Sequence, residues 1–513
     1  MAPVIIPDEG MQQLILMTAL IAGATYVVYH YFYLLYFHPL AKFPGPRIAA
    51  VSNIWYAYHW LSGRYPWATE EALRTYGDVV RIAPNELLFF TPQAFTDIYS
   101  AHVKNHETFR KTDLNSRGDK HGGLLFEQDP VRHRKVAKQV APAFSSKSTR
   151  AKEPRLHKYI DTFVLRMWMY GNGGVDVSKW CNWLAMDISA DTAYNRQMHQ
   201  MRDMKNSAIL TVLLGFNAFT TIDQVSKRFS ILGKLKYLFL PLSSVKSMKE
   251  MNQTSRDELQ RRIEKKGDTE DLDFFEQLVP AGRIVPDDPD EFRHLEQVAT
   301  QLLFAGFEPV SAWIYSTLFQ LIRHPECLEI LTTEIRNAFA RYDDISSSAL
   351  AELEYLNACL EESMRLLPSN NTGLPRVSPG ATVDGTYVPP GVIVQTSMFA
   401  TTRSPRYFHD PLHFDPRRWL SEQHPMYVPK FSMDRTRDVL PFSQGPRQCP
   451  GKEIAWTQMR LFMGKVLWTF DISQGPGRVL DIESDFVTYG FWVKPELRIN
   501  FAVRQGQAQP TSS

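Results

Sequence analysis

The stretch PFSQGPRQCPGKE, which ends at Glu453, constrains the fold of this 513-residue chain more than any other part of it. It holds one of only four cysteines, in the order Phe-x-x-Gly-x-Arg-x-Cys-x-Gly, just before a predicted helix. A thiolate ligand needs backbone N–H groups aimed at its sulfur, a tight loop to supply them, and a helix N-terminus that favours negative charge. Glycines permit such a loop, so the stretch predicts a cysteine held as a ligand. Its fixed members are Phe442, Gly445, Arg447, Cys449, Gly451 and Ala455.

The other three cysteines have a different setting. Cys181, Cys327 and Cys359 are far apart, and they lie beside apolar residues, as in KWCNW and LNACLE. This pattern is typical of a small, buried hydrophobic side chain. The chain has no C-x-x-C pair and no Cys/His cluster at zinc spacing, which argues against a disulfide framework or a structural zinc site.

The amino-terminal region departs from the composition of a soluble protein. The apolar run over residues 14–37 exceeds the ~20 residues needed to cross a hydrocarbon core, so it predicts a transmembrane anchor. Acidic residues precede the run and basic residues follow it, which places residues 1–13 on the lumenal side and the body in the cytosol. A cleaved signal peptide is the alternative, but the run is long for one and its basic residues come after it.

The rest of the chain predicts one large domain of two unequal parts. Residues 38–47 are rich in proline and are expected to form a stiff hinge between the anchor and a body over 48–505, which leaves 506–513 as a polar tail. Up to about residue 144, short strands such as VVRIAP and ELLFF alternate with helices, and beyond it the apolar spacing is mostly helical. The predicted fold is mainly α with a small β-rich lobe.

Charge and composition exclude some functions and leave one question open. Formal net charge is +2, and the basic residues form no long run that would neutralise phosphates, so nucleic acid is not an expected partner. Two apolar stretches, near 209–222 and 232–242, flank a polar connection. Core packing explains them, and contact with the membrane surface or with an apolar substrate is the alternative.

The cysteine loop resembles that of the haem-thiolate monooxygenases, the cytochrome P450 superfamily. The resemblance covers about residues 40–500 and implies the cytochrome P450 fold after the anchor, with haem b as cofactor and Cys449 as the axial ligand of its iron. It also implies that Phe442 covers the sulfur side. The residues that it implies for cofactor binding are Cys449, Arg447, Phe442, Gly451, Arg376, His133 and Ala305.

Cations are needed for the two haem propionates. Arg447, Arg376 in GLPRVSP and His133 are the candidates that the resemblance supplies. The helix around His133 departs from the family, because the tryptophan and arginine of many relatives are not evident. In this family, that helix lies on the cysteine side of the haem, where an acidic flavoprotein reductase docks on basic residues. The basic residues here are Arg132, Arg134, Lys135 and Lys138.

Two further motifs precede the cysteine loop in the family order. EESMR supplies Glu362 and Arg365, three residues apart on one helix face and close enough for an ion pair. FDPRRW supplies Arg418, which in the family joins that pair. A buried triad of one carboxylate and two guanidinium groups would fix the position of the loop that carries the cysteine.

The expected distal helix departs from the family at a position that matters for chemistry. The motif Ala/Gly-Gly-x-Asp/Glu-Thr-Thr/Ser matches AGFEPV, residues 305–310, whose small residues are expected to leave room over the iron. Pro309 stands where the family has an alcohol that helps to deliver protons, and it is expected to kink the helix. Ser311 lies ~200° around the helix and cannot simply replace that alcohol. Gly306, Glu308 and Pro309 are the expected catalytic residues.

The implied function is a monooxygenase that hydroxylates or otherwise oxidises an apolar secondary metabolite, such as a terpenoid, polyketide or alkaloid. It would use O2 and electrons from NADPH–cytochrome P450 reductase. The chain is most similar to filamentous-fungal members, which implies a single-pass protein of the endoplasmic reticulum membrane with a cytosolic catalytic domain. Phe307, Val310 and residues 369–373 are candidate pocket residues. The missing alcohol leaves two alternatives open: an oxygen-independent isomerase or dehydratase, and a haem-binding protein without turnover.

Overall fold

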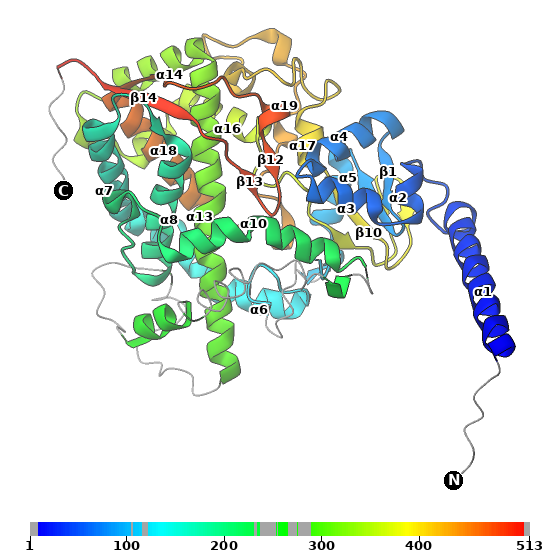
Figure 1. The fold of residues 1–513 in the computed structure, drawn as a ribbon. Coiled ribbons are helices and arrows are strands. Elements are labelled where there is room, and N and C mark those ends of the chain that lie inside the picture. The colour runs from blue at the N-terminus through cyan, green and yellow to red at the C-terminus, as the bar shows by residue number, and fades with distance from the viewer. Residues whose placement is uncertain are drawn as a thin grey trace.

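The computed structural model of the chain describes residues 9–103, 106–114, 122–229, 233–235, 253, 255–264, 274 and 289–506. The fold is mainly helical with small sheets, as the sequence predicts. α13 (Pro289–Arg323) runs through the helical body, and the β-rich lobe lies between that body and α1 (Glu9–Tyr36), which projects outward (Figure 1). Residues 1–8 and most of the stretches 232–242 and 506–513 lie outside the described residues.

The body is built from α-helices joined by short connections and 3-10 turns. Among the described residues, the other α-helices whose two ends are described are α2 (Arg47–Val51), α3 (Ile54–Leu61), α4 (Tyr65–Tyr76), α5 (Pro92–Tyr99), α6 (Pro130–Val140), α7 (Ser146–Tyr170), α8 (Val177–Tyr194), α9 (Gln200–Asp203), α10 (Ala208–Ser226), α14 (Pro325–Ala338), α15 (Ser347–Ala351), α16 (Glu354–Leu366), α17 (Met398–Thr402), α18 (Lys452–Thr469) and α19 (Ile482–Asp485). The 3-10 helices are η1 (Ala141–Phe144), η3 (Tyr342–Asp344), η4 (Pro416–Trp419), η5 (Pro429–Phe431), η6 (Thr436–Asp438) and η7 (Gly445–Arg447).

The strands are short and form several small sheets. They are β1 (Val79–Ala83), β2 (Glu86–Phe89), β3 (His102–Val103), β4 (His106–Glu107), β5 (Arg110–Lys111), β6 (Val175–Asp176), β7 (Arg376–Val377), β8 (Ala381–Val383), β9 (Thr386–Val388), β10 (Ile393–Thr396), β11 (Phe470–Gln474), β12 (Val487–Thr488), β13 (Trp492–Val493) and β14 (Arg498–Val503). The largest sheet has the order β1-β2-β10-β7-β5, and a second has the order β11-β14-β6. The remaining pairs are β3-β4, β8-β9 and β12-β13.

The β-rich lobe is assembled from two distant parts of the chain. VVRIAP and ELLFF form the antiparallel strands β1 and β2, as predicted. The next strand in the sheet is β10, which pairs in parallel with β2, so that Ile393 lies opposite Glu86. The sequence pattern suggested a lobe complete within about the first 144 residues. The structure corrects this, because pairing between strands far apart in the chain leaves no local signal.

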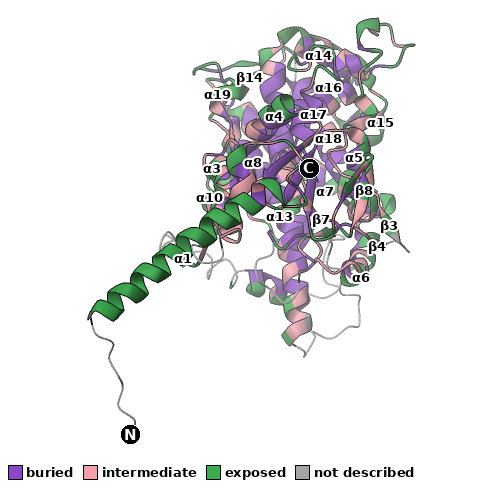
Figure 2. Cartoon of the chain, turned by 90° about the vertical axis from the view of Figure 1, so that its right-hand side faces the viewer, coloured by how far each residue is buried: buried purple, intermediate pink, exposed green. Residues whose placement is uncertain are grey.

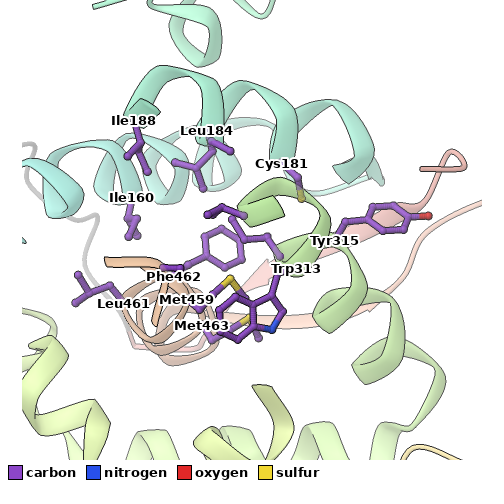
Figure 3. Close-up of a cluster of buried hydrophobic side chains, with 14 of the residues drawn as sticks. Ile160, Cys181, Leu184, Ile188, Trp313, Tyr315, Met459, Leu461, Phe462 and Met463 are labelled. Atoms are coloured by element: carbon purple, nitrogen blue, oxygen red, sulfur yellow. The ribbon is translucent and has the colours of Figure 1, made fainter. Parts of the chain in front are cut away.

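The main hydrophobic core lies where α7, α8, α13 and α18 meet (Figure 3). Its members include Ile160, Leu184, Trp313 and Phe462, one from each of these helices, and all are buried. α13 is packed on several sides and is therefore apolar around most of its circumference. This composition explains why so long a helix satisfies the hydropathy of a membrane span although 78% of its apolar window is buried in the body.

Three of the described helices are long and apolar enough to cross a membrane: Gly10–Tyr36, Ala208–Ser226 and Phe292–Arg323. None of the window of the first is buried, and α1 is exposed along almost its whole length (Figure 2). The other two windows are 39% and 78% buried, because α10 and α13 pack within the body. The first helix is therefore the candidate membrane span, and it overlaps the predicted anchor at 14–37.

The proline-rich stretch 38–47 packs against the β-rich lobe. Leu40 is fully buried in a hydrophobic cluster that includes Leu87 and Val383. Gly45 lies so close to β1 that a Cβ atom there would collide with the carbonyl oxygen of Arg81. The stretch therefore packs against the lobe, and its role as a stiff hinge between anchor and body stays a prediction.

Candidate active site

The cysteine loop, residues 441–451, is a tight turn closed by its own backbone. The N–H of Cys449 donates to the carbonyl of Phe442 at 2.9 Å, and the N–H of Gln448 donates to that of Gly445 at 3.0 Å. Gly445 has φ +73°, and a Cβ atom there would collide with the carbonyl oxygen of Tyr99 at the end of α5. Glycine is required on both counts. The loop is thus held against α5.

The Cys449 side chain is exposed, although the protein around it still removes much of the solvent from its thiol. Cys449 is exposed, whereas Cys181, Cys327 and Cys359 are buried. Burial nevertheless raises the pKa of the Cys449 thiol, and a hydrogen bond from the backbone N–H of Gly451 opposes this increase. α18 begins just after the loop, and its N-terminus favours negative charge nearby. The arrangement suits a sulfur that takes a ligand on its open side.

One face of α13 also borders open space. Ala305 is exposed in the middle of this helix and Pro309, one turn later, is half-buried, whereas Phe307 between them is buried. Residues four apart share a helix face, and the next one on this face is Trp313. The ring of Trp313 packs against Phe442 of the cysteine loop, with the ring centroids 6.0 Å apart. The open surface at Ala305 therefore faces the side on which the cysteine loop lies.

Arg447, which is part of the cysteine loop, lies close to Arg376. Arg447 Nε donates to Glu107 Oε1 at 2.7 Å, and its Nη1 donates to the carbonyl of Glu127 at 2.8 Å. Arg376, on β7, is buried and donates to the carbonyl of Leu374 at 3.2 Å. Burial and, to a smaller extent, the charge of Arg447 lower the pKa of Arg376 to about 10. The two cations therefore repel each other in a poorly solvated place.

His133 and Lys111 complete this group, and we call the four residues the cationic cluster. Burial and the charges of Arg447, Lys111 and Arg376 lower the pKa of His133 to about 3. Burial and the two arginines also lower the pKa of Lys111 far below its ordinary value. Lys111 lies opposite Arg376 in the pairing of β5 with β7. Sequence analysis missed Lys111, because only this pairing of distant strands brings it to the site.

These features can be tested for their fit to haem. A thiolate-ligated haem needs an accessible sulfur, room on its opposite face and cations for its propionates. Cys449 provides the accessible sulfur, and the open face of α13 at Ala305 provides the room on the opposite side. Cations that are desolvated and repel one another are stabilised when carboxylates bind to them. The cationic cluster therefore suits the two propionates. The residues of the site therefore fit the cofactor that the sequence implies.

Gly306 and two predicted pocket residues face away from this space. A Cβ atom at Gly306 would lie 2.6 Å from Ser189 Oγ on α8, so the small residue allows α13 to pack closely on α8. This corrects the expectation that Gly306 leaves room over the iron. Phe307 and Val310 are 0% and 5% exposed and belong to the main core. The prediction that they line the pocket is also corrected, because the sequence alone did not show which face of the helix is open.

The polar segment 369–373 joins α16 to the strands beyond it. Asn371 is buried, and its Nδ2 donates to Thr488 Oγ1 on β12 at 3.2 Å. Gly373 has φ +84°, and a Cβ atom there would collide with the side chain of Gln395. The other residues of the segment are half-buried, so they retain some accessible surface.

Of the other two expected catalytic residues, Pro309 lies on the open face of α13, and Glu308 does not. Glu308 is buried, and burial raises its pKa to about 7 while the charge of Lys494 opposes this shift. α13 continues through Pro309 without interruption. Ser311 Oγ donates to Asn182 Oδ1 on α8 at 2.7 Å. The hydroxyl of Ser311 is thus engaged on the α8 side, where it does not stand in for the missing alcohol.

Glu362, Arg365 and Arg418 form a fully buried triad. Arg365 donates to both oxygens of Glu362, from Nε at 2.7 Å and from Nη2 at 2.8 Å. Arg418 Nε donates to Glu362 Oε1 at 2.9 Å, and Trp419 Nε1 donates to Oε2 at 2.9 Å. Burial alone would raise the pKa of Glu362, but its two arginines and Trp419 hold it at about 2. The carboxylate is therefore ionised and fully engaged.

The triad also fixes the chain that leads to the cysteine loop. Arg365 Nη1 donates to the carbonyls of Thr402 and Pro411, each at 2.6 Å. Arg418 forms a second ion pair with Asp434, which also accepts from the N–H of His409 at 2.7 Å. Asp434 was not predicted, because its sequence position carries no spacing signal.

α6 presents a basic face next to the cysteine loop. Arg132, Lys135 and Lys138 are exposed, and Arg134 is half-buried. The side chain of Asp129 caps the helix by accepting from the N–H of Val131 at 2.8 Å. A pocket of about 350 Å³ is lined by His102, His133, Arg134, Ala137, Gly445 and Pro446. The basic face and the cysteine loop therefore lie on the same side of the molecule.

Comparison with known proteins agrees with this geometry. A family model described as Cytochrome P450 matches residues 46–498. The chain is 54% identical over 470 residues to "Cytochrome P450 monooxygenase TwmD" of Talaromyces wortmannii, with 91% of this chain and 92% of that protein covered. It is 34% identical to "Cytochrome P450 monooxygenase BOA3" of Botryotinia fuckeliana, with 94% and 95% covered. It is 31% identical to "Fusicoccadiene 8-ol C-16-hydroxylase" of Phomopsis amygdali, with 95% and 93% covered.

Proposed function

This chain belongs to the cytochrome P450 family and is a monooxygenase, and on this premise we propose that it hydroxylates or otherwise oxidises an apolar secondary metabolite. O2 and electrons from NADPH–cytochrome P450 reductase are the proposed co-reactants. The observation that carries the proposal is the open thiol of Cys449 on the side to which the open face of α13 at Ala305 is turned. Bound haem supplies the oxygen-activating redox chemistry in such a site.

The residues of the chain are proposed to bind and orient haem b. Cys449 would ligate the iron, the N–H of Gly451 would support the thiolate, and Phe442 would cover the sulfur side. The cationic cluster would bind the propionates. The triad would fix the loop, since a desolvated bidentate ion pair holds geometry more than it adds stability.

A terpenoid, polyketide or alkaloid skeleton is the proposed substrate class. The similarity to a fusicoccadiene 8-ol hydroxylase supports a largely apolar molecule that already carries oxygen. Exposed Ala305 and half-buried Phe304 supply apolar surface on α13. The half-buried polar residues of 369–373 would contact an oxygen atom of the substrate.

The proposed partner and location follow from the surface. The basic face of α6 favours docking of an acidic reductase near the cysteine loop. Such docking weakens at high ionic strength. α1 is proposed to anchor the protein in the endoplasmic reticulum membrane, with the catalytic domain in the cytosol.

Pro309 favours a second candidate function. Without an alcohol at this position, the chain is a candidate for an oxygen-independent rearrangement or dehydration of a substrate that is already oxygenated. A haem-binding protein without turnover is the remaining alternative, and the intact thiol loop and triad argue against it.

The test uses membranes that contain the full chain and the reductase, supplied with the metabolite that accumulates when the gene is deleted. The reduced carbon monoxide complex should show the long-wavelength band of thiolate ligation in the native chain and in Cys327→Ala, but not in Cys449→Ser. Product formation should consume NADPH and O2. Product formed without either co-reactant would establish the rearrangement instead, and no product with any oxidant would indicate a protein without turnover.

A further inference from the structure

A buried glutamine of α13 lies one helical turn before the open face at Ala305. Gln301 and Ala305 are four residues apart and therefore share one side of the helix. Ala305 is exposed, whereas Gln301 is only 5% exposed. This side of α13 thus changes from covered to open within one turn, and the residues that cover Gln301 lie at the edge of the open space.

The cover is formed by residues 122–127, which we call the bridging segment. The N–H groups of Leu124 and Leu125 both donate to Gln301 Oε1, at 2.8 and 2.6 Å. Gln301 Nε2 donates to the carbonyl of Gly122 at 3.0 Å. Backbone groups of an irregular turn need polar partners when they are withdrawn from water. A single amide side chain supplies the partner for three of them here.

The bridging segment fits closely against α13. Gly123 has φ +62°, and a Cβ atom there would collide with the side-chain amide of Gln301. Glycine is therefore required at this position both for the backbone conformation and for the close approach. The half-buried side chain of Leu124 packs against the main core. Polar and apolar contacts thus hold the segment on the helix.

The other end of the bridging segment reaches the cationic cluster. Lys111 Nζ donates to the carbonyl of Leu125 at 2.6 Å, and Arg447 Nη1 donates to that of Glu127 at 2.8 Å. The segment therefore runs from the cations proposed for the haem propionates to the helix that carries the open face. A buried glutamine with a purely structural role has no reason to lie at this edge. The position of the segment determines how much of the open side is covered.

We propose that Gln301 is a positioning residue that limits ligand size, because it holds the bridging segment as a wall of the substrate space beside Ala305. When the amide is removed, the segment moves away from α13 more often, and larger apolar ligands enter. Gln301 acts through the segment and does not itself contact the ligand. The inference rests on the proposed function, since it assigns a wall of the same site.

Hydrogen–deuterium exchange of the purified full-length holoprotein tests whether Gln301 holds the segment. Gln301→Met keeps the length of the side chain and removes its donor and acceptor. The amides of Leu124 and Leu125 should then exchange about 10- to 100-fold faster, because the hydrogen bonds that protect them are lost. Gln320 is a matched control, since it is also buried in α13 and its Nε2 has no hydrogen-bond partner in the described part of the chain. Gln320→Met should leave both exchange rates unchanged.

Ligand size selectivity is measured by titration with imidazole and with the much bulkier clotrimazole, each followed by the absorption change when its nitrogen binds the haem iron. Clotrimazole should bind when the segment is displaced, so its apparent affinity should rise with the displaced fraction, about tenfold or more in Gln301→Met. The affinity for imidazole should stay constant. Gly123→Ala displaces the segment from its own side and should change the ratio of the two dissociation constants in the same direction.

The thiolate band of the reduced carbon monoxide complex is recorded first for every sample. Its absence from the native chain would mean failure of the proposed function. With the band present, native exchange rates in Gln301→Met would show that the amide does not hold the segment. An unchanged ratio of dissociation constants, or an equal loss of affinity for both ligands, would show a purely structural role and overturn the proposal. If Gln301→Met alone lacks the band, Gly123→Ala decides between these outcomes.

Discussion

Arg81 of β1 donates a hydrogen bond from Nη1 to the backbone carbonyl of Leu34, 2.8 Å away, near the end of α1. Its Nη2 donates to the carbonyl of Pro84 at 2.7 Å, and its backbone N–H donates to that of Pro44 at 2.8 Å. Arg81 is buried, and it forms no ion pair with a carboxylate of the described residues. A cation at a helix C-terminus interacts favourably with the free carbonyls there. One residue of the sheet therefore joins α1, the proline-rich stretch and the lobe.

Arg81→Met should release the stretch 38–47 from the lobe. Loss of hydrogen bonds from a charged group costs about 1.5–3 kcal/mol, which corresponds to roughly 10- to 100-fold more frequent opening. Limited trypsin digestion at Lys42 and Arg47 of membrane-bound protein should accelerate accordingly. Arg74→Met, which removes an exposed arginine paired with Glu71, serves as the control. Equal digestion of both variants would show that Arg81 does not hold the stretch.

Glu362→Gln should destabilise the protein by about 3–5 kcal/mol, because two buried guanidinium groups lose their carboxylate. The pKa of Glu362 falls from 4.5 to about 2 on folding, so its contribution is complete above pH 4.5 and is lost as the pH falls toward 2. Acid unfolding is monitored by loss of the thiolate band. The stability of the native chain should show this dependence between pH 4.5 and pH 2, and the stability of Glu362→Gln should not.

The neighbouring Glu361 provides a control of opposite sign. Burial raises the pKa of Glu361 to about 7, so this group lowers stability as the pH rises from 4.5 to 7. Glu361→Gln should therefore stabilise the protein at pH 8. It should leave the pH dependence of unfolding between pH 4.5 and pH 2 unchanged. The same response in both variants would contradict the ionised triad.

Gly445→Ala should abolish the thiolate band, because a Cβ atom would collide with the carbonyl oxygen of Tyr99 and displace the cysteine loop. Gly385 has the same φ, +73°, in the turn between β8 and β9, but a Cβ atom there would meet nothing within 4 Å. Gly385→Ala should cost only the left-handed backbone strain, about 1–2 kcal/mol, and keep the band. Retention of a normal band in Gly445→Ala would show that the loop tolerates displacement.

Lys111→Met should weaken haem retention about tenfold or more, since a charged hydrogen bond to a carboxylate contributes about 1.5–3 kcal/mol. The rate of haem transfer to apomyoglobin measures this, and the propionate bending bands in the resonance Raman spectrum should shift. Lys135→Met, on the exposed face of α6, is the control. If the Raman bands and the transfer rate stay unchanged, Lys111 does not contact a propionate.

Pro309→Thr should keep haem binding and change the chemistry, because it restores the family alcohol on the open face of α13. With NADPH, reductase and substrate, the ratio of product to released hydrogen peroxide should differ from that of the native chain. Iron content and the thiolate band check that the site is intact. A constant ratio would indicate that proton delivery does not depend on an alcohol at this position.

The sequence is sufficient for features that depend on local spacing. The cysteine loop is defined by glycine positions, and Glu362 with Arg365 follows from the separation of three residues on a helix. Lys111 and Asp434 could not be found in this way. They reach their partners through a strand pair and an irregular loop, so their roles depend on how distant segments meet.

The misassigned residues of α13 have a different cause. An apolar helix packed on several sides carries no amphipathic signal that marks one open face. Phe307 and Val310 therefore looked equivalent to Ala305 until the contacts of Trp313 with the cysteine loop fixed the orientation of the helix.

β2 gains its parallel neighbour only after about 300 more residues have left the ribosome, because Glu86 lies opposite Ile393. At about 5–20 residues per second, this strand waits roughly 15 to 60 s with one edge unpaired. An edge of that kind pairs readily with other chains. Production of this protein in a foreign host should therefore depend on chaperone capacity during this interval. Slow translation through the middle of the mRNA should prolong the time in which the unpaired edge can aggregate.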